Sequence, residues 1–138
     1  MEYTLILGNS MDIKSLTKAE EQLMQIIWKL REAIVKDILA QFEGTKPAYT
    51  TIATVLIVLE KKGFVSHRKI GNSKLFTPAI SKAEYTKFQF SSLLGNYFGG
   101  SFPKLASFFA KENDMDISDL EKVLKEAEKE MKKDQEKN

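Results

Sequence analysis

The hydrophobic pattern of this 138-residue chain changes its period at Gly63, and this change constrains the fold more than any other feature of the sequence. Before Gly63, apolar residues recur in three segments at the spacing of amphipathic helices. After it, two short runs of strand-like composition flank the turn sequence Gly71-Asn72-Ser73. The pattern therefore predicts three helices followed by a β-hairpin.

The first two predicted helices have clear boundaries. Thr17 and Glu20 form a capping box ahead of an apolar stripe, so the first helix is expected over about residues 18–31. A shorter amphipathic helix follows in the apolar pattern of residues 35–42, and Gly44 ends it.

Residues 49–62 carry two conflicting signals. The helical signal is the i, i+3, i+4, i+7 spacing of Ile52, Val55, Leu56 and Leu59. The segment is also rich in β-branched residues, which favour strands. Its length decides between them, because fourteen residues without a turn signal exceed an ordinary strand. We therefore predict a helix.

Residues 64–70 are predicted to form an edge strand, and residues 75–77 the strand that returns after the turn. Basic residues lie along this hairpin and near its tip. Three helices followed by a basic hairpin describe a winged helix-turn-helix. The predicted fold class is mainly α with a small β-hairpin wing, continued by a helical C-terminal segment.

That C-terminal segment contains two more capping boxes, SKAE at residues 81–84 and SDLE at residues 118–121, each of which predicts a helix start. Gly99-Gly100 ends the first of these helices, and Pro103 suits the first turn of a short helix between them. Coiled-coil spacing in the last helix is expected for Leu120, Leu124, Ala127 and Met131.

Aromatic residues are concentrated in the same segment. Six of the nine phenylalanines lie after residue 81, and under sixty residues of chain are too few to enclose them. We expect an identical partner to cover these rings; the alternative is that they fold back on the N-terminal helices. The predicted dimerisation residues are Tyr97, Phe98, Phe102, Leu105, Phe108, Phe109, Leu120 and Leu124.

The expected organisation has three parts. Residues 1–13 form an N-terminal tail, in which Met11 is a second candidate start, residues 14–80 a winged-helix DNA-binding domain, and residues 81–138 a helical dimerisation domain.

Composition excludes several classes of function. The chain has no cysteine and a single histidine, His67, so disulfides, cysteine nucleophiles, thiolate zinc sites and histidine-pair metal sites are ruled out. The glycines do not follow the spacing of a phosphate-binding loop or a dinucleotide-binding motif. Pairs of neighbouring carboxylates occur only in polar or charged segments, where no apolar pocket would shift their pKa values for acid–base catalysis. No apolar run approaches a membrane span, and residues 1–10 lack the features of a secretory signal. We expect a cytoplasmic protein without cofactor, metal or enzymatic activity.

The formal net charge of +2 hides a local excess of basic residues over 44–80. A single acidic residue, Glu60, stands in this segment against Lys46, Lys61, Lys62, Arg68, Lys69 and Lys74. Such an excess suits contact with phosphates, and the alternative is a solvated basic surface.

The segment over residues 49–62 offers a DNA-reading face if it is helical. Threonines on its outer face can hydrogen-bond base edges or phosphates, and the helix N-terminus favours a phosphate. Lys46 before the helix and basic residues of the wing would fix the register on the backbone. The predicted DNA-binding residues are Lys46, Ala48, Tyr49, Thr50, Thr51, Thr54, Lys61, Arg68, Lys69 and Lys74.

Three segments resemble the penicillinase-repressor (BlaI/MecI-type) transcriptional regulators: LTKAEEQLMQIIW at 16–28, KPAYTT at 46–51 and LEKKGFV at 59–65. The resemblance covers about residues 14–130. It implies a dimeric winged-helix repressor of β-lactam-resistance or related genes that binds dyad operators in double-stranded DNA. It also implies that residues 49–62 are the recognition helix, and that a membrane sensor-protease triggers cleavage in the dimerisation domain.

The sequence departs from the family's pattern at two places. Ile57 and Val58 occupy the stretch where the family's recognition helix often carries an arginine. Alignment on Gly99-Gly100 places Phe108-Phe109 at the family's Asn-Phe cleavage point, so phenylalanine replaces the asparagine. The copper-responsive branch uses a C-terminal cysteine cluster, so copper sensing is excluded here. The alternative function is a winged-helix module that docks a protein partner and does not bind operators.

Overall fold

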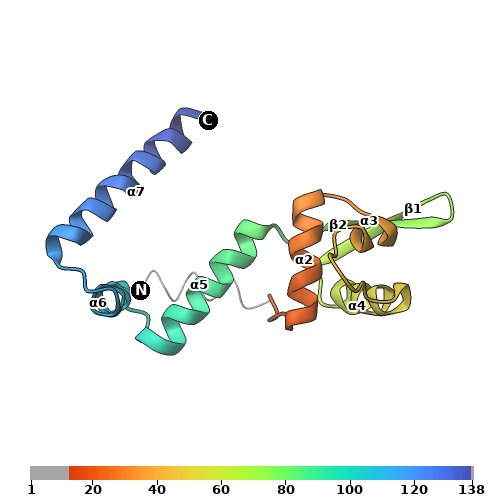
Figure 1. The fold of residues 1–138 in the computed structure, drawn as a ribbon, viewed down its shortest axis with the longest axis horizontal. Helices are drawn as coiled ribbons and strands as arrows, with labels where there is room; N and C mark the ends of the chain where they lie inside the picture. The colour runs from red at the N-terminus through yellow and green to blue at the C-terminus, as the bar shows by residue number, and fades with distance from the viewer. Residues whose placement is uncertain (1–12, 138) are drawn as a thin grey trace. The chain divides into compact units, whose positions relative to one another are not determined.

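The structure, a computed structural model, describes residues 13–137, which form six helices and two strands (Figure 1). The chain divides into two compact units, and the boundary falls between Ser92 and Leu93, within the fourth helix of the described part. The elements are α2 (Lys18–Leu30), α3 (Val35–Leu39), α4 (Tyr49–Lys61), β1 (Val65–Ile70), β2 (Ser73–Pro78), α5 (Lys82–Phe98), α6 (Phe102–Glu112) and α7 (Ile117–Lys137). The prediction of a mainly α fold with a hairpin wing is confirmed.

The capping box of α2 is confirmed in both directions. The amide of Glu20 donates to Thr17 Oγ1 over 3.2 Å, and the amide of Thr17 donates to Glu20 Oε1 over 2.9 Å. The helix ends at Leu30 and not at the predicted Arg31, because Arg31 has a φ of +72° and so leaves the helical region.

The ambiguous segment is a helix, as its length predicted. Helix α4 buries Ile52, Leu56 and Leu59 on one face, and it ends one residue before the predicted Lys62. Gly63 follows with a φ of +85°, the left-handed conformation in which helices commonly stop.

Helix α3 is shorter than predicted. It ends at Leu39 and not at Phe42, because the chain tightens there into a turn. Within this turn the amide of Gln41 donates to the carbonyl of Ile38 over 3.0 Å, and that of Phe42 donates to Leu39 over 3.2 Å. These i to i+3 bonds belong to a tighter turn than an α-helix.

The antiparallel hairpin runs from Val65 paired with Pro78 to Ile70 paired with Ser73. The loop is therefore Gly71-Asn72 alone, and Ser73, predicted in the turn, belongs to β2. The predicted first strand residue, Phe64, precedes β1 and is fully buried in the core.

A short bridge that the sequence pattern did not predict extends the sheet at its base. Ala33 and Phe76 exchange two backbone hydrogen bonds of 3.0 and 2.8 Å, which fastens the connection between α2 and α3 to β2.

The core of the first unit lies where α2, α3 and α4 meet the base of the hairpin. Trp28 donates its indole proton to the carbonyl of Ile80 over 2.8 Å, and Leu16 donates its amide proton to the hydroxyl of Tyr85 over 3.0 Å. Burial raises the pKa of the Tyr85 phenol. The buried core residues are Leu23, Met24, Ile27, Ala33, Val35, Ile38, Ile52, Leu56, Leu59, Phe64, Val65, Phe76 and Tyr85.

One of the six late phenylalanines lies against this core, beside the buried ring of Tyr85. Phe88 packs against it, with its ring 5.7 Å from that of Tyr85. The expectation that an identical partner covers all six late phenylalanines is therefore wrong for Phe88.

In the second unit, the start of α7 differs from the prediction. The reciprocal box joins Asp116 and Asp119: the amide of Asp119 donates to Asp116 Oδ1 over 2.9 Å, and the amide of Asp116 donates to Asp119 Oδ2 over 3.0 Å. The predicted box from Ser118 to Glu121 is wrong, because Ser118 already lies inside the first turn. The predicted tail lies outside the described residues except for Ile13, which is half-buried against the core of the first unit.

Candidate nucleic-acid interface

The outer face of α4 carries a continuous exposed stripe. Thr50, Thr54, Ile57 and Lys61 are spaced i, i+4, i+7 and i+11, so their side chains share one side of the helix. All four are exposed, and the face opposite them holds the buried residues of the core. Thr51 is exposed beside this stripe. The predicted threonines are thus placed on the solvent side of the helix.

One of these threonines, Thr54, uses its hydroxyl proton within the helix. Thr54 donates its hydroxyl proton to the carbonyl oxygen of Thr50 over 2.9 Å, one turn earlier in the helix. Its oxygen keeps lone pairs that can accept a proton, but its only hydroxyl proton is used inside α4.

The N-terminus of α4 suits an anion. Ala48, in extended conformation, precedes the helix without a side-chain cap, and the first turn contains no acidic residue. The amides of the first turn therefore lack the carboxylate or hydroxyl partner that caps α2, and they carry the positive end of the helix dipole. Lys46 is exposed two residues earlier.

The hairpin brings two of the predicted cations directly together. Lys69 and Lys74 are cross-strand partners, and both are exposed. Arg68 pairs with Leu75 and lies on the other face of the hairpin, because successive strand residues alternate between faces. The wing therefore presents a lysine pair on one face and a single arginine on the other.

Two residues of the basic segment are engaged elsewhere. Lys62 Nζ lies 2.6 Å from Glu20 Oε1 and 3.3 Å from the carbonyl oxygen of Ser15. This lysine therefore forms an ion pair within the protein and does not add to the exposed basic surface. Glu60 is the acidic residue of the segment, and its Oε1 atom lies 2.6 Å from Nδ1 of His67. Burial raises the pKa of Glu20, but the hydrogen bond and charge of Lys62, with the bonds from Thr17, outweigh it and leave the pKa below 4.5.

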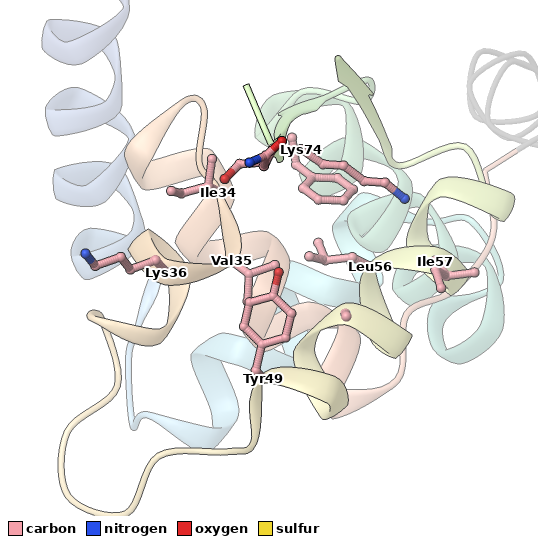
Figure 2. A pocket seen from close by; sticks show the side chains of 11 residues that line it. Ile34, Val35, Lys36, Tyr49, Leu56, Ile57 and Lys74 are labelled. Atoms are coloured by element: carbon pink, nitrogen blue, oxygen red, sulfur yellow. The ribbon is translucent and has the colours of Figure 1, made fainter. Parts of the chain in front are cut away.

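A pocket of about 320 Å³ lies beside the stripe, between the start of α3, the wing and α4. Its lining is mainly apolar, and the ring of Tyr49, whose side chain is 60% exposed, points into it (Figure 2). The side chains of Lys36 and Lys74 point away from the pocket on opposite sides (Figure 2). The sequence prediction did not include Lys36 and Ile57 among the residues of this surface. The i+7 spacing from Thr50 could have shown that Ile57 lies on the exposed face of α4.

The predicted dimerisation residues are distributed over the second unit as follows. Tyr97, 76% exposed, lies in the last turn of α5. The rings of Phe98 and Phe108 lie 5.6 Å apart, which places half-buried Phe98 against α6. Phe102, Phe108, Phe109 and Leu124 are exposed in the single chain, whereas Leu105 and Leu120 are half-buried.

The sequence profile of the family described as penicillinase repressor matches residues 16–129. The chain belongs to the penicillinase repressor family. The penicillinase repressor of Bacillus licheniformis is 27% identical over 118 residues, which cover 83% of this chain and 92% of that protein. The methicillin resistance regulatory protein MecI of Staphylococcus aureus (strain N315) is 23% identical over 109 residues, which cover 78% of this chain and 89% of that protein.

Among solved structures, the DNA-binding domain of the repressor BlaI is 31% identical with a TM-score of 0.47, covering 53% of this chain and 90% of that one. The monomeric form of Bacillus licheniformis BlaI in complex with the blaP half-operator matches with 31% identity, a TM-score of 0.45 and the same coverage.

Membership of the penicillinase repressor family makes this chain a DNA-binding transcriptional repressor and not an enzyme. Within residues 13–137, no group of histidine, aspartate and glutamate side chains is arranged to hold a metal ion. No helix in the same range is both long enough and apolar enough to span a membrane.

Proposed function

We propose that this protein is a homodimeric repressor that binds dyad operators in double-stranded DNA, with the exposed face of α4 in the major groove. Residues 14–80 would be the DNA-binding domain and residues 81–138 the dimerisation domain. The proposed targets are β-lactam-resistance or related genes, as in the relatives named above, and the proposed location is the cytoplasm.

The observation that carries this proposal is the cross-strand pair of Lys69 and Lys74. Like charges directly opposite each other destabilise a hairpin, and the sequence of the wing contains no acidic residue to offset them. A phosphate between the two ammonium groups would remove this repulsion and release counterions. The pair therefore costs stability in the free protein and gains affinity on DNA.

Sequence reading is assigned to α4. Thr50 and Thr51 stand at its exposed N-terminal end and can donate to base acceptors or to phosphates, while the first-turn amides receive a phosphate. Lys46, Lys61 and Arg68 would add backbone contacts around this centre.

Dimerisation is supported by the apolar stripe of α7. Ile117, Leu120, Leu124, Ala127 and Met131 recur at the a and d spacing of a coiled coil. Most of these side chains are exposed in the single chain; Leu124 and Met131 are each 64% exposed. A second copy would bury them, and two DNA-binding units on one frame would gain effective concentration on a dyad site.

We also propose that cleavage in the dimerisation domain by a membrane sensor-protease relieves repression. Phe108 and Phe109 lie within α6, and both are more than half exposed. Cleavage within the dimerisation domain would weaken the dimer and thereby lower its affinity for DNA.

Fluorescence anisotropy on a duplex from the protein's own upstream region tests the proposal. A scrambled duplex is the control, and both are measured at two salt concentrations. Preferential binding that weakens steeply with salt supports the repressor; equal, weak and salt-independent binding overturns it.

The alternative is a winged-helix module that docks a protein partner. The observation that favours it is the exposure of Tyr49, Ile57 and Ile70 around the α4 and wing surface. An apolar docking surface would bind its partner with little dependence on salt, which separates the two functions in the same experiment.

A further inference from the structure

Ile57 is an apolar residue on a face that would otherwise be polar. It lies on the stripe of Thr50, Thr54 and Lys61, its side chain is 53% exposed, and it takes no part in the core of the first unit. Ile52, in the same helix, is buried, so the helix has no need of a second isoleucine on its outer side to fold.

The middle of the stripe also lacks a hydrogen-bond donor. The hydroxyl proton of Thr54 goes to the carbonyl of Thr50, and the next position along the stripe is Ile57. Guanine N7 and O6 and adenine N7 are read in the major groove by donors, so this part of α4 is unsuited to them. The groove feature that remains for an aliphatic side chain is the C5-methyl group of thymine.

We propose that Ile57, together with the methyl group of Thr54, recognises thymine methyl groups in the major groove and so determines operator specificity. This inference rests on the proposed DNA-binding function. The three-residue step from Thr54 to Ile57 advances about 4.5 Å along the helix, which lies between one and two base-pair rises of about 3.4 Å. The operator half-site therefore carries thymine at one or two successive positions opposite the middle of α4.

Deoxyuridine in place of thymidine provides the test, because it removes the methyl group and leaves the pairing edge unchanged. A preferred duplex is first selected from a random pool with the full-length protein, and each thymine is then replaced singly. At one or two positions, replacement should weaken binding by about fourfold, the loss expected for one buried methyl group.

Ile57→Ala should weaken binding to the thymine duplex and should no longer distinguish thymine from uracil at those positions. Ile70→Ala is the matched control, since Ile70 is an exposed isoleucine of the hairpin, and it should keep the distinction. Circular dichroism melts of both variants establish that they fold.

The outcomes separate this inference from the proposed function. If a selected duplex is bound specifically but no thymine position responds, or if Ile57→Ala still distinguishes the two bases, the role of Ile57 is wrong and the repressor stands. If selection enriches no sequence and binding does not depend on salt, the proposed function falls, and this inference with it.

Discussion

Lys62 Nζ lies 2.6 Å from Glu20 Oε1 and thereby ties the end of α4 to the first turn of α2. Glu20 also belongs to the capping box of α2, so one carboxylate both starts a helix and holds the recognition helix in place. Both side chains are largely buried, which limits screening of the pair by salt.

Glu20→Gln tests this tie. Glutamine can keep the capping bond to Thr17 but not the charge, so the free energy of unfolding at pH 7 should fall by about 1.5 kcal/mol. Because the folded-state pKa of Glu20 lies below 4.5, its contribution is present above pH 4.5 and is lost as the pH falls through the folded value. Urea unfolding at pH 7 and near pH 3 should show the larger difference at the higher pH. Glu21→Gln is the control, and an equal loss at both pH values would refute the prediction.

Lys74→Ala should have opposite effects on stability and on DNA binding. Removing one of two facing lysines should stabilise the free protein by about 0.2–1 kcal/mol. It should also weaken binding to specific and scrambled duplexes alike and reduce the slope of log K against log salt by about 1. Lys18→Ala removes the same charge from α2 and should leave the slope unchanged. An unchanged slope in Lys74→Ala would rule out the phosphate contact.

Phe109→Glu combined with Leu124→Glu should produce monomers, because two charges would enter the apolar surface of α6 and α7. Sedimentation should show the mass of one chain, and operator affinity should fall although no predicted DNA contact is altered. Lys122→Glu, away from the a and d positions of α7, should remain dimeric. An unchanged mass in the double variant would show that these residues do not form the dimer.

Asp116→Ala should lower the free energy of unfolding of the second unit by about 1 kcal/mol, since the start of α7 loses its cap. Ser118→Ala, at the position that the sequence favoured, should have a much smaller effect. Helix content on thermal melting compares the two, and the reverse order of effects would restore the predicted box.

Local signals predicted much of the fold. The box of Thr17 and Glu20 is a short-range feature, and α4 was decided by length over the preference of its β-branched residues. What the sequence missed depends on the surroundings of each residue. Asp116 and Ser118 are both good caps, and the choice between them depends on where the chain leaves the turn after α6. Ala33 reaches Phe76 only because the folded core brings them together.

The same distinction holds for the candidate interface. The exposed threonines follow from helical spacing alone. The ion pair that keeps Lys62 out of the exposed basic surface could not be predicted in this way, because its partner Glu20 lies 42 residues away in the chain. The pairing of Lys69 with Lys74 required the register, which a one-residue change in the turn would have altered.

The measurement to make first is the specificity ratio, the affinity for the selected duplex divided by the affinity for a scrambled one. It is compared between wild type and a double variant that carries Thr50→Val and Thr51→Val. Valine keeps the shape of threonine and removes its hydroxyl, so a reading face should lose sequence preference and keep its phosphate contacts. Wild type should prefer its selected duplex to a scrambled one by at least about a thousandfold, the lower range for specific binding. The variant should lose most of this preference while its affinity for the scrambled duplex and its salt dependence stay the same. A variant that retains the full preference would show that the hydroxyls of Thr50 and Thr51 do not read DNA.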